Sequence, residues 1–148
     1  MNFRCQLIVL LVTTSTLGCT TSNPVVTLPL AATTRNAGQI ANTTLVSQGT
    51  QTGFTFFIGG VPDGASLPLR LYTFIYSGSC QQPGPVAYAM NDRIDTERMA
   101  RARAWTYSRN APITMPDLLS GKYSIVVRTT PADGNADIFC GDIKQASM

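Results

Sequence analysis

The cysteine and histidine counts constrain this chain more than any other feature of its sequence. Four cysteines and no histidine occur among the 148 residues. Cys5 and Cys19 lie near the N-terminus, and only Cys80 and Cys140 remain for the rest of the chain. Histidine is the commonest metal ligand and the commonest general base, so its absence removes the usual basis of zinc sites, serine triads and Cys–His pairs. The composition allows one disulfide in the body of the protein and excludes imidazole chemistry.

The first 18 residues have the layout of a signal peptide. Arg4 supplies one positive charge, and an apolar run, Leu7–Val12, follows it. No charged residue occurs from Cys5 to Gly18. This segment is shorter than the roughly 20 apolar residues that span a bilayer. We therefore expect a cleaved signal peptide over residues 1–18; the alternative is an N-terminal anchor helix that is retained.

The residues at the cleavage point, Leu17-Gly18-Cys19, resemble the lipobox of bacterial lipoproteins, in which a small residue precedes a lipid-modified cysteine. The match is incomplete because Thr16 stands where leucine is preferred. The resemblance implies acyl chains, palmitate among them, on Cys19, and several chains together hold a protein on a membrane. The alternative, ordinary cleavage near Gly18, leaves a free thiol on Cys19, which is a liability in an exported protein.

The residue after the expected lipid anchor is Thr20, not aspartate, and in lipoproteins this implies sorting to the outer membrane. We expect residues 19–30 to form the lipidated N-terminus and a tether, with the protein facing the periplasm. In that oxidising compartment, Cys80 and Cys140 are expected to form a structural disulfide, which closes a loop of about 60 residues and contributes roughly 4 kcal/mol. A redox-active pair is the alternative. The net charge of +3 is too small to indicate a nucleic-acid partner.

Short segments of β-type residues, separated by turn residues, follow one another after the tether. The clearest is Arg70–Tyr76, in which aromatic and aliphatic residues alternate with period two. Alternating alanine and arginine predict a further strand over Ala102–Ser108. Eight such strands in one domain, residues 31–148, indicate an all-β antiparallel sandwich or barrel. The other expected strands are Val25–Leu30, Gln39–Val46, Gly53–Ile58, Val86–Met90, Tyr123–Arg128 and Ala136–Ile143.

Four segments together resemble the bacterial Cu,Zn superoxide dismutases. Phe54–Pro62 resembles an alternating strand and its turn, and Leu71–Cys80 resembles a G-F-H-I-H strand that runs to a cysteine. Tyr123–Arg128 is similar to the strand that delivers a later copper ligand, and Ile138–Ile143 is similar to the C-terminal A-C-G-V-I. The resemblance implies an eight-stranded Greek-key β-sandwich, and it implies the same disulfide, between Cys80 and Cys140.

The residues that would carry that family's chemistry are different here. The resemblance equates the first two copper-ligand histidines with Thr73 and Ile75, and the later one with Arg128. The arginine that guides the anion corresponds to Asp137, which would repel superoxide. Copper and zinc sites of this kind need imidazole nitrogen or thiolate sulfur, which Thr, Ile and Arg do not supply. We expect the scaffold without the chemistry: no enzyme activity, no bound metal and no cofactor.

Two other groups of residues could hold a metal. Methionine thioethers suit Cu(I), although methionine is also a common filler of cores. These methionines are Met90, Met99, Met115 and Met148. The carboxylates of Asp92, Asp95 and Glu97 could serve acid–base chemistry or Ca²⁺, although such residues more often lie in a solvated turn.

The function that remains is a non-catalytic, membrane-anchored envelope module that binds a partner or has a structural role. Its candidate partner surface consists of Arg98, Arg101, Arg103, Trp105 and Tyr107, since arginine and large aromatic residues are typical anchors of interfaces, and Tyr72, Tyr76 and Arg109 could extend it. The opposing interpretation is that the aromatic residues belong to the core and the arginines are merely solvated. The partner would be an unknown envelope protein or polymer. The alternative function is an envelope metal-binding or redox protein with a rebuilt copper or zinc site.

Overall fold

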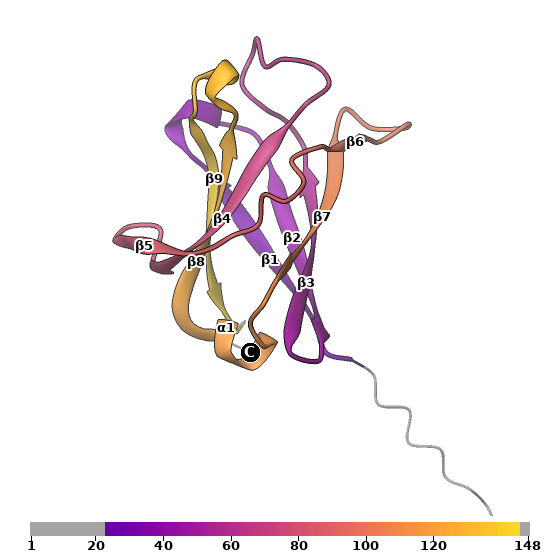
Figure 1. The fold of residues 1–148 in the computed structure, drawn as a ribbon. Coiled ribbons are helices and arrows are strands. Elements are labelled where there is room, and N and C mark those ends of the chain that lie inside the picture. Colours follow the sequence, from indigo (N-terminus) through magenta and orange to yellow (C-terminus); the bar gives the residue numbers. More distant parts are fainter. Residues whose placement is uncertain (1–22, 146–148) are drawn as a thin grey trace, which may run out of the picture.

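The computed structural model describes residues 23–145, which form an all-β domain of nine strands in one curled antiparallel sheet (Figure 1). The expected signal peptide and Cys19 lie outside the described residues. The strands are β1 (Val25–Ala32), β2 (Ala41–Gln48), β3 (Gln51–Ile58), β4 (Leu71–Gly78), β5 (Pro83–Ala89), β6 (Glu97–Arg98), β7 (Trp105–Ala111), β8 (Ser120–Thr129) and β9 (Asp137–Lys144). The helices are η1 (Thr34–Asn36), α1 (Met115–Leu118) and η2 (Pro131–Asp133). None of these described helices is long and apolar enough to cross a membrane.

The strand β1 joins two halves of the sheet, whose order is β5-β4-β8-β9-β1-β2-β3-β7-β6. Residues 25–30 of β1 pair with β2, whereas Ala31 and Ala32 pair with β9. The sheet curls at this change of partner, so that the half with β4, β8 and β9 packs against the half with β2, β3 and β7 (Figure 1). The result is a sandwich-like fold with a strand shared between its layers.

Period-two alternation in the sequence determines which side chains face the core. On β4, the buried residues Leu71, Thr73 and Ile75 alternate with the half-exposed aromatic residues Tyr72, Phe74 and Tyr76. Successive side chains of a strand point to opposite faces, so the first group is placed in the core and the second on the outer face. The same alternation on β3 and β7 buries Phe54, Phe56 and Tyr107, whose stacked rings form the aromatic part of the core. 

The register shows that the N-terminus and the β6–β7 hairpin lie at opposite ends of the domain. Val25 is level with Gly53 and Asn110 across β1, β2, β3 and β7. Leu30, at the other end of β1, is level with Trp105. The connection from β6 to β7 therefore projects from the end of the sheet that is farther from Val25, as Figure 1 shows.

The sequence-based expectations hold for most strands and are wrong for some boundaries. The all-β class is confirmed, but the described residues form nine strands instead of the expected eight. The strand expected over Ala102–Ser108 is instead β7, Trp105–Ala111, because residues 100–103 form the turn of the hairpin. Residues 25–30, which the sequence analysis expects both as the first strand and as part of the tether, form most of β1 at the centre of the sheet, so the strand is confirmed and the tether is shorter.

Candidate functional site

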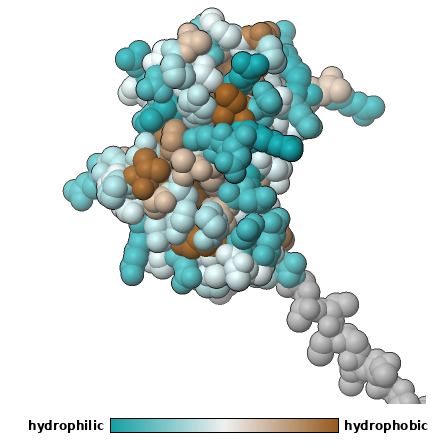
Figure 2. Space-filling model, viewed as in Figure 1, coloured by the Kyte–Doolittle hydropathy of each residue, from teal (hydrophilic) through white to brown (hydrophobic). Residues whose placement is uncertain are grey.

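The candidate partner surface lies on the β6–β7 hairpin. Arg98 belongs to β6, and Arg101 and Arg103 belong to the turn, which is closed by a 3.0 Å bond from the backbone N–H of Met99 to the carbonyl of Ala104. All three arginines are exposed. Figure 2 shows that the projecting tip of this hairpin is mainly hydrophilic. The short strand and the turn thus hold three positive charges away from the body of the domain.

The two aromatic residues of the candidate surface have different environments. Trp105 is partly buried, and the guanidinium of Arg98 lies 4.9 Å from its ring centroid, so the pair forms one cation–π contact on the hairpin. Tyr107 is only 5% exposed, and its hydroxyl shares a 3.0 Å hydrogen bond with Oγ1 of Thr73 across the core. Burial raises the pKa of Tyr107 well above its usual value. Tyr107 is therefore a core residue and cannot form part of a partner surface.

Arg109, which the sequence analysis considered for the partner surface, is instead a charged residue of the interior. It is 7% exposed, and its guanidinium lies 4.4 Å from the ring centroid of Tyr107. Its Nη1 donates to the carbonyl of Ser108 at 2.7 Å and its Nη2 to the carbonyl of Asp95 at 3.5 Å, while its buried Nε has no acceptor. Burial lowers the pKa of Arg109 because the charged form is poorly solvated.

Arg109 lies at an open seam between β7 and the chain segment that precedes β6. The strand β6 pairs with β7 only at Thr106 and Trp105, so the rest of this edge of β7 has no neighbouring strand among the described residues. Two cavities, of about 420 and 210 Å³, border the seam, and both are lined by Arg109 and Arg93. At this seam the guanidinium of Arg109 reaches from β7 to the carbonyl of Asp95, and Asp95 in turn forms a β-bridge with Arg70.

A second arginine–aromatic cluster lies on the outer face of β4, β8 and β9. Arg128 donates from Nε to Asp137 Oδ1 at 2.5 Å and from Nη2 to the hydroxyl of Tyr76 at 3.1 Å. Its guanidinium lies 5.0 Å from the ring centroid of Phe74. The hydrogen bond to Asp137 raises the pKa of Arg128. The positions that the resemblance equated with a copper ligand and the guiding arginine are thus joined in one ion pair.

The expected disulfide is present beside this cluster. Cys80 and Cys140 are bonded and join the loop after β4 to β9. The backbone N–H of Cys80 also donates to Asp142 Oδ1 at 2.7 Å, which fixes the loop over the outer face of β9. A cavity of about 270 Å³ lies between the disulfide and the Arg128–Asp137 pair.

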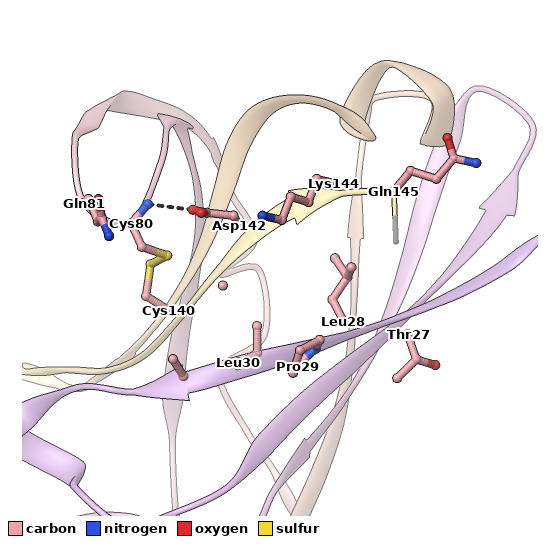
Figure 3. A pocket seen from close by; sticks show the side chains of 12 residues that line it. Thr27, Leu28, Pro29, Leu30, Cys80, Gln81, Cys140, Asp142, Lys144 and Gln145 are labelled. Atoms are coloured by element: carbon pink, nitrogen blue, oxygen red, sulfur yellow. Dashed lines mark hydrogen bonds between the residues drawn. A yellow bond between two sulfur atoms is a disulfide. The ribbon is translucent and has the colours of Figure 1, made fainter. Parts of the chain in front are cut away.

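A larger cavity, of about 460 Å³, opens on the other side of the disulfide, where β1 and β9 separate. Figure 3 shows the two strands diverging beyond Cys140, with Leu28 and Leu30 between them. Two residues account for the divergence. Pro29 has no N–H to donate to a neighbouring strand. At Gly141, a Cβ would come within 2.5 Å of the Leu30 side chain, so only glycine permits the close contact at which the strands begin to separate.

The residues considered as metal ligands are not assembled into a cluster. Thr73 and Ile75, equated by the resemblance with copper ligands, are buried in the core. Met90 and Met115 are also buried among core residues, and Met99 is exposed on the hairpin, whereas Met148 lies outside the described residues. Asp95 pairs with Arg70 at 3.5 Å, and no group of three or more His, Cys, Asp or Glu side chains within residues 23–145 could hold a metal.

Comparisons with known proteins give no relative: no family model, no curated protein and no solved structure matches the chain.

Proposed function

We propose that the protein is a non-catalytic, membrane-anchored module of the bacterial envelope that binds a partner through the arginines of its β6–β7 hairpin. The observation that carries this proposal is the position of the hairpin. Three exposed arginines, Arg98, Arg101 and Arg103, project at the end of the sheet opposite the one where the chain enters β1. A protein held by a lipid on Cys19 therefore presents these charges away from its anchoring membrane.

The tether between the proposed lipid and the sheet is short. Six residues, 19–24, precede β1 and reach at most about 20 Å when fully extended. Such a tether keeps the N-terminal end of the sheet near the membrane and the hairpin at the far side of the domain. The hairpin suits a partner with an acidic surface, because arginine forms bidentate hydrogen bonds with carboxylates and phosphates.

We also propose that the scaffold is related to the Greek-key sandwich of the Cu,Zn superoxide dismutases. The disulfide between Cys80 and Cys140, which joins two of the four segments that carry the resemblance, supports this relationship. In this proposal the scaffold has lost its metal chemistry and acts as a rigid support for the hairpin.

The test is capture of partners from a detergent-solubilised envelope fraction by the purified full-length protein. The variant Arg101→Gln/Arg103→Gln should lose the specific partner and should unfold at the same temperature as the wild type, because both residues are exposed. The matched control is Lys122→Gln/Lys144→Gln, which removes two exposed charges from the other end of the sheet. Equal capture by all three proteins would contradict the assignment to the hairpin.

The alternative function, an envelope metal or redox protein, is tested on the same sample. The protein is incubated with copper and zinc, desalted and analysed for metal, and its superoxide dismutase activity is measured. We expect neither stoichiometric metal nor activity. One bound copper or zinc per chain would support a rebuilt site and would overturn the proposal of a purely non-catalytic module.

A further inference from the structure

At the seam, no carboxylate of residues 23–145 lies within ion-pair distance of the buried Arg109, and Asp95 acts on its charge only from farther away. Two ion pairs are present in residues 23–145, Arg70–Asp95 and Arg128–Asp137, and Arg109 belongs to neither. An unpaired charge in the interior is costly, and proteins usually pair or neutralise such a group. The cation–π contact with Tyr107 and the two carbonyl acceptors offset part of that cost. An anion bound in the adjoining cavity would offset the remainder.

The edge of β7 next to Arg109 offers further hydrogen-bond donors. The carbonyl of Ala104 accepts a bond from Met99, so the backbone groups of this residue point toward β6. Backbone groups alternate between the two edges of a strand, and those of Ser108 and Asn110 therefore point to the same side as Ala104. The strand β6 does not extend to these residues. Their N–H groups thus face the seam beside the guanidinium.

The smaller of the two seam cavities has an excess of positive charge. Arg93 and Arg109 line it together with the single acidic residue Asp92, and Ser108 and Asn110 of the β7 edge also border it. The larger cavity is lined by the same two arginines but also by Asp95 and Glu97, so its charges balance. The smaller cavity, about 210 Å³, has room for a group of a few heavy atoms.

We propose that the smaller seam cavity binds a small oxyanion, a carboxylate or phosphate group, between Arg93 and the buried Arg109. Arg93 is exposed and lines the cavity with a charged group open to solvent, whereas Arg109 is held against the ring of Tyr107 and supplies a buried positive charge. The attraction does not require a direct contact with the buried Nε, because charges in a poorly solvated site interact strongly over several ångströms. This site is separate from the arginines of the hairpin turn and does not depend on the proposed function.

The experiment is a thermal unfolding titration of the full-length protein with sodium phosphate, sodium sulfate and sodium acetate, each compared with sodium chloride at equal ionic strength. A bound oxyanion should raise the unfolding temperature in a saturable manner, by about 5 °C at ten times its dissociation constant. Phosphate and acetate distinguish the two sources of the anionic group. A response to the oxyanions that does not exceed that to chloride would overturn the proposal.

Two variants locate the effect. Arg93→Gln removes the exposed partner of the site and should abolish the saturable response without lowering stability in chloride. Arg103→Gln makes the same change of charge on the hairpin and should keep the response. If Arg93→Gln responds like the wild type, the anion binds elsewhere and the proposal is wrong.

A second measurement uses only the wild-type protein and so does not depend on the folding of a variant. The Nε–H signal of Arg109 in a ¹H–¹⁵N spectrum of the wild-type protein reports directly on the seam. We expect this signal to shift with the same dissociation constant as the thermal response. A constant Nε–H signal during a saturable thermal response would place the anion away from Arg109 and would also overturn the proposal.

Discussion

Two regions of the molecule place an arginine against an aromatic ring, with opposite consequences for the charge. On the outer face of β4, β8 and β9, Arg128 contacts Phe74 and pairs with Asp137, and its pKa is raised. At the seam beside β7, Arg109 contacts Tyr107 without a carboxylate partner, and its pKa is lowered. The ring contact is common to both arginines, so the opposite directions of their pKa shifts come from the counter-ion and from the extent of burial.

The two regions also differ in the strands and links that surround each arginine. The outer face around Arg128 lies beside a disulfide and between paired strands. The seam around Arg109 is bordered by an unpaired strand edge and two cavities. The region around Arg128 thus has a disulfide and an ion pair, whereas at the seam the exposed ion pair Arg70–Asp95 leaves the buried Arg109 without a direct partner among residues 23–145.

The largest expected effect is loss of the disulfide. The double variant Cys80→Ala/Cys140→Ala should lower the free energy of unfolding by about 4 kcal/mol, because the bridge closes a loop of 60 residues that the unfolded chain otherwise explores freely. Chemical denaturation in urea measures the change. Wild-type protein treated with a reductant should show the same loss, and a loss below about 1 kcal/mol would contradict the view that this side depends on the bridge.

The second prediction concerns the role of Arg109 in filling the seam. Arg109→Met keeps most of the volume and removes the unpaired charge, so in chloride buffer its free energy of unfolding should equal or exceed that of the wild type. Arg109→Ala removes both and should be about 2 kcal/mol less stable than Arg109→Met, because it leaves a gap between the halves of the sheet. Urea denaturation of the two variants separates the effect of removing the charge from the effect of removing the side-chain volume. Equal stability of the Met and Ala variants would show that Arg109 does not fill the seam.

The third prediction uses the buried hydroxyl of Tyr107. Tyr107→Phe should lower the free energy of unfolding by about 1 kcal/mol at neutral pH, because the buried Thr73 hydroxyl loses its partner. Burial raises the pKa of Tyr107 in the folded state. The stabilisation that comes from keeping its hydroxyl protonated is therefore complete below the pKa of an unfolded tyrosine, about 10, and is lost as the pH rises above that value.

The alkaline dependence separates Tyr107 from the other tyrosines. Unfolding experiments from pH 9 to 11.5 should show stability falling more steeply for the wild type than for Tyr107→Phe, by up to about 1.4 kcal/mol per pH unit. Parallel curves for the two proteins would mean that Tyr107 ionises in the folded state as readily as in the unfolded state.

The smallest effect is expected for the ion pair on the outer face. Arg128→Met should cost about 1 kcal/mol at low salt and less at high salt, because Asp137 is partly exposed and the pair is partly screened. The control is Arg70→Gln, which removes a longer and more exposed ion pair and should have no measurable effect. A loss above about 3 kcal/mol for Arg128→Met would mean that this face is as intolerant of an uncompensated charge as the interior.

Much of the fold could be predicted from alternation in the sequence, and the errors have physical causes. Arg70–Tyr76 alternates between a buried and a half-exposed set of residues and corresponds to part of β4, whereas Tyr123–Arg128 is a mainly apolar run, buried without interruption over residues 124–127, and corresponds to part of β8. Ala102–Ser108 also alternates, but alanine is too small to fix a buried face, and most of its first half is the turn of the hairpin. Alternation therefore predicts a strand reliably only where the alternating residues are large enough to form a core.

The candidate site was less predictable than the fold. The exposure of Arg98, Arg101 and Arg103 agrees with their positions in a polar segment. Tyr107 and Trp105, however, have similar neighbours in the sequence and differ in burial. Arg109 could be located only by extending the alternation of β7 from Tyr107, which places an arginine on the buried face. Its lack of a counter-ion depends on where segments distant in the sequence lie, and no local pattern contains that information.

The register of β1, β2, β3 and β7 also has a mechanical consequence. In the proposed function, the membrane anchor would pull at Val25 and a partner on the hairpin would pull at the opposite end of these strands. Because interstrand hydrogen bonds in an antiparallel sheet are perpendicular to the strands, such a force loads many of them simultaneously in shear. A force between the two ends of these strands is therefore resisted by many hydrogen bonds together, whereas the same force applied across the strands would break them one after another.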